Sequence, residues 1–397
     1  MRIDPDDIAI CLGHGARATP PTRTRTTQGP EPMMPPIVQT SLFAFESFEA
    51  LCEGLSEEHR RHVYTRGQNP TVEAIERQLA ALERGARCKC FASGMAAISS
   101  VMYGLLEAGD HVLFVNQIYG PTLELARHLR RFGIEHDVSL HLDLDSIEQA
   151  LRPETKLIWL ESPGTMLYRM VDVPAVCRLA KGRGIMVGMD NTWATPLLQK
   201  PLTVGVDIVA HSCAKYIGGH SDVIAGALIA SDSVMEQIFY RSYLLNGGIL
   251  GPHDAWLLIR GLRTLPTRLQ QHETGGLAVM EFLQRHPAVE AVYHPAASGD
   301  SGLVEDQLAG YTGLFSFALA GADHARVSRV IDALRLFKIG VSWGGVESIV
   351  LSPNRGGAAT ESYLETAGIP PGLIRLSIGL EPPDTLIADL DAALSAA

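Results

Sequence analysis

Residues 185–215, IMVGMDNTWATPLLQKPLTVGVDIVAHSCAK, give the clearest indication of the fold. It holds two short and mostly apolar runs, residues 185–189 and 206–210. Such runs are typical of strands buried on both faces, as in a parallel sheet that is covered by helices. Asp190 directly follows the first run, and the segment after the second run ends in Lys215. An acid and a lysine therefore follow two predicted strands.

The same pattern extends toward the N-terminus. Residues 111–115 and 157–160 are further apolar runs, whereas residues 123–131 and 173–181 have the apolar spacing of helices. Strands that alternate with helices predict an α/β fold with a mostly parallel sheet. A further helix is predicted after Asn69 and Pro70, an N-cap and first-turn proline, with Gly85 placed to end it.

The two ends of the chain differ from this central pattern. After about residue 255, predicted helices (255–268, 325–337) and strands (313–319, 348–351) indicate a smaller α+β domain. Near the N-terminus, residues 18–36 contain six of the 23 prolines, so they cannot form a helix or a central strand. This segment is either a flexible arm or an arm that binds a neighbouring subunit.

Composition excludes several classes of protein. Of the 397 residues, 46% are apolar and 19% are charged, which excludes a disordered chain. No apolar run is long enough for a membrane helix, and the acidic start shows no secretory signal. The net charge of −11 argues against nucleic acid or an anionic membrane as partner. We expect a soluble, cytoplasmic protein of two or three domains.

Asp190 and Lys215 together indicate a particular chemistry. Either residue alone would usually be a solvated loop charge. A lysine in a partly dry pocket has a lowered pKa and can attack a carbonyl to form an imine. Pyridoxal phosphate (PLP) needs such a lysine, together with a carboxylate that keeps its pyridine nitrogen protonated. Asp190 and Lys215 are therefore candidate catalytic and cofactor-binding residues.

The remaining parts of a PLP site can also be found along the chain. Gly94 and Met95 open a predicted helix whose first amides could hold a phosphate, and Ser212 could add a hydroxyl donor. Tyr119 follows the strand at 111–115, so its ring could stack on the cofactor and its hydroxyl could transfer a proton. Each of these features alone has a plain structural alternative, such as an ordinary helix start or a core tyrosine.

Two arginines are candidates for anion binding. Arg66, close to Tyr64, could bind a phosphate with its planar guanidinium, although an exposed surface arginine is the alternative. Arg375 lies in an apolar segment and could bind the substrate carboxylate, but an ion pair with Glu347 or Glu381 is an equal alternative. No cysteine or histidine cluster has the spacing of a metal site, so no metal is expected.

Taken together, these residues resemble the Cys/Met-metabolism family of PLP-dependent enzymes along nearly the whole chain. The resemblance is carried by eight motifs, which occur in the family's order: YTRG (64–67), SGMA (93–96), YG (119–120), ESP (161–163), DNTW (190–193), KY with GHSD (215–222), GLRTL (261–265) and GVES (345–348).

The resemblance implies fold type I, with a mostly parallel seven-stranded sheet covered by helices and a smaller C-terminal α+β domain. It divides the chain into an N-terminal arm that contacts a neighbouring subunit (1–62), a PLP-binding domain (63–255) and a C-terminal domain (256–397). It further implies a homotetramer, a dimer of dimers with shared active sites. Tyr64 and Arg66 would then bind the cofactor phosphate of the neighbouring subunit, with Tyr64 also touching substrate.

Within the family, the chain resembles bacterial cystathionine β-lyases most. Thr165 stands where γ-type members usually have an asparagine, and Ser342-Trp343 stands where they tend to have Ser-Leu. There are two departures: Ala214 replaces the usual threonine before the lysine, and Val341 replaces a tyrosine of the β-lyases.

This resemblance leads to an expected activity, the β-elimination of L-cystathionine to homocysteine, pyruvate and ammonia. Lys215 would hold the cofactor and move the Cα proton, with Tyr119 or Lys215 as proton donor to sulfur. Arg375 and Ser342 would bind the substrate carboxylate, with Trp343 close by. The alternatives are γ-elimination or γ-replacement by a member of the same family, and a catalytically silent protein of this fold that acts as a regulator.

Overall fold

The computed structural model describes residues 1–14, 32–299 and 301–396. The expected N-terminal arm at 18–36 lies mostly outside these residues. No helix in the described part of the chain is long and apolar enough to cross a membrane.

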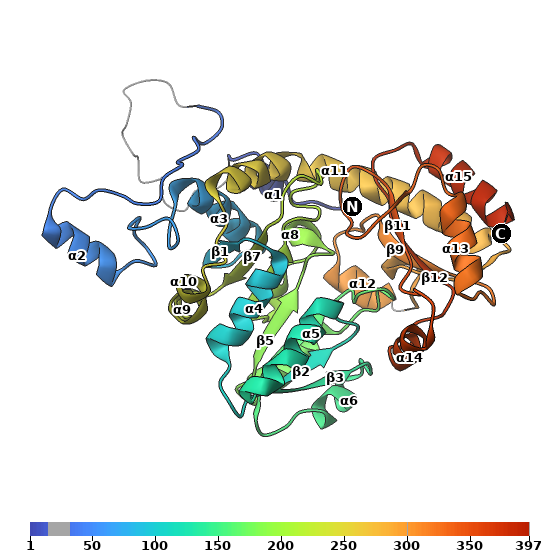
Figure 1. Cartoon of the computed structure of the whole chain (residues 1–397), viewed down its shortest axis with the longest axis horizontal. Coiled ribbons are helices and arrows are strands. Elements are labelled where there is room, and N and C mark those ends of the chain that lie inside the picture. The colour runs from blue at the N-terminus through green and yellow to red at the C-terminus, as the bar shows by residue number, and fades with distance from the viewer. Residues whose placement is uncertain (15–31, 300, 397) are drawn as a thin grey trace.

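A seven-stranded sheet forms the centre of the molecule (Figure 1). In spatial order its strands are β1 (Arg87–Phe91), β7 (Gly226–Ala230), β6 (Ile208–Ser212), β5 (Met186–Asp190), β4 (Thr155–Glu161), β2 (His111–Val115) and β3 (Glu135–Ser139). Strands β3, β2, β4, β5 and β6 run parallel, and β7 runs antiparallel to both of its neighbours. The mostly parallel seven-stranded sheet is confirmed. The pattern missed β1, which contains a lysine, and β3, which is mostly polar. It also missed β7, although this strand is apolar throughout.

Helices cover both faces of this sheet. The helices of this part of the chain are α1 (Pro5–Cys11), α2 (Phe48–Ser56), α3 (Pro70–Glu83), α4 (Gly94–Leu105), α5 (Gly120–Leu129), α6 (Leu144–Gln149), α7 (Val173–Lys181), α8 (Thr195–Leu198), α9 (Asp232–Ile238) and α10 (Leu244–Asn246). Alternate residues of β2 point to opposite faces, so Phe114 packs with α4 and α5 while Leu113 and Val115 pack with α7. This two-sided burial explains why the strands are continuously apolar.

The ends of α3 show where local sequence rules succeed and where packing intervenes. Asn69 caps the helix as predicted, with its side chain accepting a hydrogen bond from the Thr71 amide at 3.0 Å. The left-handed residue at the other end is Arg84 (φ 61°), not the predicted Gly85. Gly85 is needed for a different reason, because a Cβ there would lie 2.2 Å from Cγ2 of Ile229.

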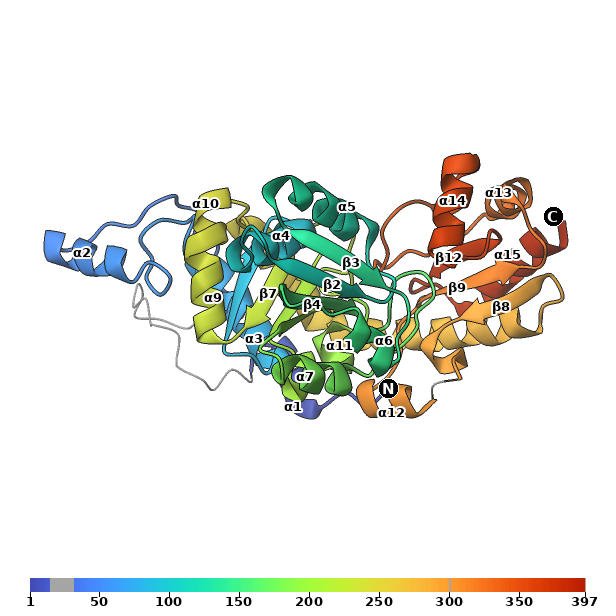
Figure 2. The same ribbon diagram turned by 90° about the horizontal axis from the view of Figure 1, so that it is seen from below.

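A second, five-stranded sheet follows toward the C-terminus (Figure 2). Its spatial order is β10 (Lys338–Ile339), β11 (Ile349–Leu351), β12 (Leu373–Ser377), β9 (Leu314–Leu319) and β8 (Val289–Tyr293). The helices of this part are α11 (Pro252–Arg285), α12 (Ser301–Gln307), α13 (His324–Ala333), α14 (Ala358–Thr366) and α15 (Pro383–Ala396). The smaller α+β region is confirmed.

Helix α11 joins the two sheets, and it is much longer than the predicted helix at 255–268. Its 34 residues continue past Pro266, a residue that normally interrupts a helix. Burial compensates, because α11 packs against α3 near the first sheet and against β8 and α15 near the second. The expected domain boundary at 255/256 falls inside this helix, and the division into three regions stays a prediction.

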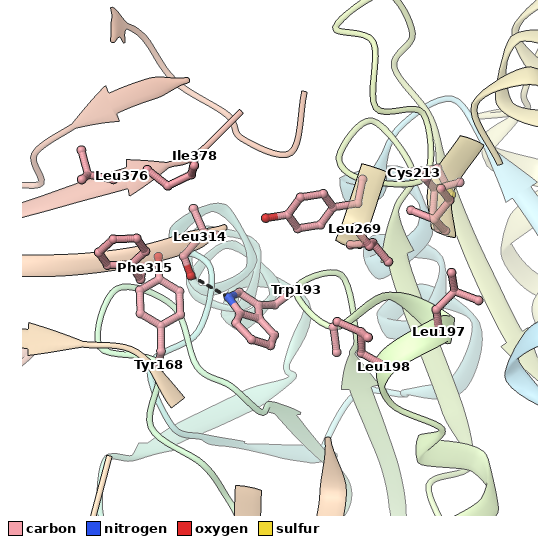
Figure 3. Close-up of a cluster of buried hydrophobic side chains, with 14 of the residues drawn as sticks. Tyr168, Trp193, Leu197, Leu198, Cys213, Leu269, Leu314, Phe315, Leu376 and Ile378 are labelled. Carbon is pink, nitrogen blue, oxygen red and sulfur yellow. Dashed lines mark hydrogen bonds between the residues drawn. The ribbon is translucent and has the colours of Figure 1, made fainter. Parts of the chain in front are cut away.

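Trp193 also connects the two sheets (Figure 3). It follows β5 by three residues, and its indole Nε1 donates a hydrogen bond to the carbonyl oxygen of Leu314 at 3.0 Å. Tyr168 lies beside it in the same buried cluster. The loop after Asp190 is therefore fixed to β9 of the second sheet.

Candidate active site

A cavity of about 500 Å³ lies at the carboxyl ends of the parallel strands, where ligands bind in open α/β sheets. Its walls include nine of the predicted site residues: Gly94, Met95, Tyr119, Asp190, Ser212, Lys215, Ser342, Trp343 and Arg375. These residues come from strand ends, helix starts and the second sheet, and they are up to 281 positions apart in the chain. The structure therefore brings together residues that the sequence analysis proposed one by one.

Lys215 lies between β6 and β7 with its amine in the cavity. Its Nζ is 2.6 Å from the hydroxyl oxygen of Ser342 and 5.6 Å from the centre of the Trp343 ring. Burial and the positive charge of Arg375 lower the pKa of Lys215, the charge of Asp190 opposes them, and the resulting pKa is about 8. A substantial fraction of the amine is neutral near pH 8, as a nucleophile or base requires.

Asp190 ends β5 and is held in place by Thr192. The Thr192 amide donates to Oδ1 of Asp190 at 3.0 Å, and the Thr192 hydroxyl donates to the same oxygen. The Thr192 hydroxyl oxygen also accepts a hydrogen bond from the Ser212 amide at 2.8 Å, so it links β5 to β6. Burial raises the pKa of Asp190, while these hydrogen bonds and the charges of His211 and Lys215 lower it.

Glu161 is a second buried carboxylate of the site, and it pairs with Asp190 in the register of β4 and β5. Its Oε1 accepts a hydrogen bond from the amide of Tyr119 at 2.7 Å. Burial and repulsion from Asp190 raise the pKa of Glu161 well above its usual value. The hydrogen bonds from Thr192 and the charges of His211 and Lys215 favour the ionised form of Asp190, whose charge in turn disfavours ionisation of Glu161.

The N-terminus of α4 forms a cradle for an anion. Ser93 caps the helix by accepting a hydrogen bond from the Ala96 amide, and Gly94 follows it at the cavity wall. A Cβ at Gly94 would lie 2.9 Å from Cβ of Ser212, so any other residue would fill the space. Ala214 also lines the wall but brings no hydroxyl. The cradle, the lysine and the acid fit the phosphate, aldehyde and pyridine nitrogen of PLP.

The second sheet contributes Arg375 and Ser342 to the opposite wall. Nη2 of Arg375 donates to the carbonyl oxygen of Ser342 at 2.9 Å. The proposed ion pair of Arg375 with Glu347 or Glu381 is wrong, because Glu381 accepts hydrogen bonds from Ser348 and Glu347 accepts one from Ser221. Arg375 lacks a carboxylate partner within the described residues, which leaves its guanidinium available to a substrate carboxylate.

Tyr64 and Arg66 do not line the cavity of their own chain. Arg66 instead lies over the Tyr64 ring, 5.6 Å from its centre, and 43% of Tyr64 is exposed. The segment before them projects from the body of the molecule with α2 at its tip (Figures 1 and 2). Their predicted role at a neighbouring subunit stays a prediction.

Three residues of the site were not predicted from the sequence: Glu161, Tyr168 and Thr192. A signal existed for Glu161, which follows the apolar run 157–160 just as Asp190 follows 185–189. Tyr168 lies on an irregular loop with φ of 51°, and no local pattern places it. No group of side chains in the described part of the chain could hold a metal ion.

Comparisons with known proteins agree with this geometry. Residues 21–395 match the family model described as Cys/Met metabolism PLP-dependent enzyme. The chain belongs to this family. It is 39% identical over 366 residues to an L-methionine γ-lyase of Fusobacterium nucleatum subsp. polymorphum, covering 90% of this chain and 92% of the relative. It is 38% identical over 343 residues to a cystathionine γ-lyase of Bacillus subtilis, covering 85% and 89%.

A solved structure is similar over almost the whole chain. The crystal structure of metB from Corynebacterium glutamicum superposes with a TM-score of 0.87 at 31% identity, covering 98% of this chain and 97% of that one. The family is PLP-dependent, so the predicted cofactor and fold type I are both confirmed. The similar lyases are named for γ-carbon chemistry, and the predicted preference for β-elimination is not supported by them.

Proposed function

We propose that the protein is a PLP-dependent lyase that cleaves the Cγ–S bond of a sulfur amino acid such as methionine or cystathionine. The observation that carries the proposal is the 39% identity to a methionine γ-lyase along 90% of the chain. This proposal replaces the expected β-elimination, which rested on two short motifs. With methionine the products would be 2-oxobutyrate, ammonia and methanethiol.

Each of the main cavity residues has a separate role in the proposed reaction. When bound, PLP supplies an aldehyde for the substrate amine and a ring that accepts electrons from Cα. Lys215 takes the Cα proton and, after releasing it, a Cβ proton, since burial and Arg375 bring its pKa to about 8. Loss of the Cβ proton supplies the electron pair that expels sulfur from Cγ. Asp190 supplies the negative charge that favours a protonated ring nitrogen. Arg375 holds the substrate carboxylate, and Tyr119, at the cavity wall, is placed to donate a proton to sulfur.

A second candidate, β-elimination, is favoured by one feature of the wall. Trp343 packs against Lys215 and Tyr216, and its bulk narrows the space next to the amine. Thr165, in the position where γ-type members usually have asparagine, also lines the cavity. Both features match the β-lyase pattern and compete with the evidence from the relatives.

Identification of the keto acid separates the candidates. The purified holoenzyme is incubated with L-methionine and, separately, with L-cystathionine, and the keto acid is identified by mass spectrometry. Release of 2-oxobutyrate from either substrate supports γ-elimination, and pyruvate from cystathionine supports β-elimination. The Lys215→Ala variant serves as control for uncatalysed release. Bound PLP without turnover of any sulfur amino acid, alone or with a thiol acceptor, would support a silent regulator instead.

We further propose that the active enzyme is a homotetramer, a dimer of dimers, in which Tyr64 and Arg66 reach the cofactor phosphate of a neighbouring subunit. The apolar residues on and near α2 support this, because Phe48 is 80% exposed in the single chain. Arg66→Ala and Lys215→Ala subunits, each nearly inactive alone, are refolded together. In a hybrid dimer one site receives both defects and the other neither, so activity should return. Hybrids that form without activity would overturn the shared site.

A further inference from the structure

A buried acid outside the cavity has no part in the mechanism above. Glu83, in the last turn of α3, and His211, in β6, both have side chains with 0% exposure. Nε2 of His211 lies 2.6 Å from Oε1 of Glu83, and Nδ2 of Asn191 donates to the same oxygen at 2.9 Å. An ionised carboxylate only accepts hydrogen bonds, so Nε2 of His211 donates to Glu83 whenever that carboxyl group is charged.

The two partners of Glu83 are the chain neighbours of cofactor-facing residues. Asn191 directly follows Asp190, and His211 directly precedes Ser212. Asp190 and Ser212 line the cavity, whereas Asn191 and His211 do not, as expected for consecutive residues that point to opposite sides. Glu83 therefore links β5 to β6 on the side of the sheet that faces away from the cavity. Thr192 links the same two strand ends on the cavity side.

This arrangement also has an electrostatic consequence. Burial raises the pKa of Asp190, and the charge of His211 is one of the effects that oppose it. Removing the Glu83 carboxylate would take away the hydrogen bonds that fix the His211 ring and the Asn191 amide next to Asp190. The environment that keeps Asp190 ionised would then be weakened.

We propose that Glu83 is a positioning residue that acts through His211 and Asn191 to orient Asp190 and keep it charged toward the cofactor ring nitrogen. The inference rests on the role that the proposed function gives to Asp190.

The same helix provides a matched control. Glu76 is also a buried glutamate of α3, and it forms an ion pair with Lys89 at 3.0 Å. Lys89 donates to the carbonyl oxygen of Gly67, so this pair fixes the loop at residues 64–68 rather than the strand ends at Asp190. Glu76→Gln therefore removes a comparable buried charge with a different structural connection.

The test measures protonation of the ring nitrogen directly. Wild type, Glu83→Gln and Glu76→Gln are loaded with PLP that carries ¹⁵N in the pyridine ring, and the ¹⁵N chemical shift is recorded. In Glu83→Gln the signal should move toward that of a deprotonated ring, while in Glu76→Gln it should stay at the wild-type value. In Glu83→Gln, kcat should also fall by about 10- to 100-fold, the range seen when partners behind metal ligands are removed.

An unchanged signal in folded Glu83→Gln, or an equal change in both variants, would overturn the inference. If Glu83→Gln does not fold, the same ¹⁵N measurement is made on His211→Gln, which removes the hydrogen-bond partner of Glu83 instead. Asp190→Asn is the reference for the proposed function. If Asp190→Asn leaves the signal unchanged, the role of Asp190 itself is wrong, and that failure is distinguishable from failure of the Glu83 inference.

Discussion

The two walls of the cavity are built in different ways. At the edge of the large sheet, hydrogen bonds join Asp190, Thr192 and Ser212, and the buried Glu83 cluster lies on the other side of these strand ends. The opposite wall comes from loops and the second sheet. There Ser342 has a φ of 76°, an unusual conformation for a residue with a side chain, and 78% of Val341 is exposed.

This difference suggests a division of roles: the sheet edge carries out the chemistry, and the loop wall selects the substrate. A rigid strand edge can hold a charge at a defined place with little reorganisation, as electrostatic stabilisation requires. Exposed and irregular loops tolerate substitution more readily, so they are where members of a family diverge. The disagreement between the β-lyase motifs and the γ-lyase relatives concerns the loop wall, through Thr165 and Trp343. We therefore expect substitutions at the sheet edge to reduce the rate of the reaction strongly, and substitutions at the loop wall to change mainly the choice of substrate.

The largest effect is expected at the sheet edge, for Lys215→Ala. Among the residues that the structure describes, Lys215 is the only lysine in the cavity wall, so the variant should lose elimination completely. It should also lose the bond to PLP that borohydride can reduce, which mass spectrometry of the treated protein detects. A reducible PLP adduct on any other lysine of the variant would show that Lys215 is wrongly assigned.

The next effect is expected for Asp190→Asn, which retains the shape of the side chain but removes its charge. Elimination should fall by about 10²-fold or more, the scale of losing one fixed electrostatic contact at a reacting centre. Steady-state rates with the best substrate provide the measurement. A rate within about threefold of wild type would mean that the sheet edge does not act through this charge.

A third prediction compares the walls through the pKa of Lys215 in cofactor-free protein. The amine should titrate with a pKa of about 8, as measured by the pH dependence of its acetylation in competitive labelling. Arg375→Met should raise this pKa because it removes a positive charge, and Asp190→Asn should lower it because it removes a negative one. Shifts of the same sign in both variants would contradict this account.

The smallest effect concerns Ala214, which lines the cavity without a hydroxyl. Ala214→Thr should tighten PLP binding by about 1 kcal/mol, the value of one net hydrogen bond. Equilibrium dialysis against PLP measures the change, with Ala214→Val as a control of similar shape that lacks the hydroxyl. Equal binding by the threonine and valine variants would show that Ser212 or a water already occupies that position.

The features of the molecule that follow local rules could be predicted from the amino-acid sequence. Buried strands are continuously apolar and helices repeat every three to four residues, so the α/β class followed from pattern alone. Asp190 and Lys215 could be found because parallel strands end at one edge of a sheet, which places the residues after them together. The motifs then led to the family and its cofactor.

Features that depend on contacts between distant segments could be found only in the folded molecule. Helix α11 continues through Pro266 because packing against two sheets outweighs the lost hydrogen bond. Gly85 is required by Ile229, which lies 144 positions further along the chain, and not by the turn in which it lies. In the same way Arg375 contacts Ser342 instead of an acid, and Glu83 reaches His211. Local sequence carries no record of such partners, because each depends on how whole elements pack.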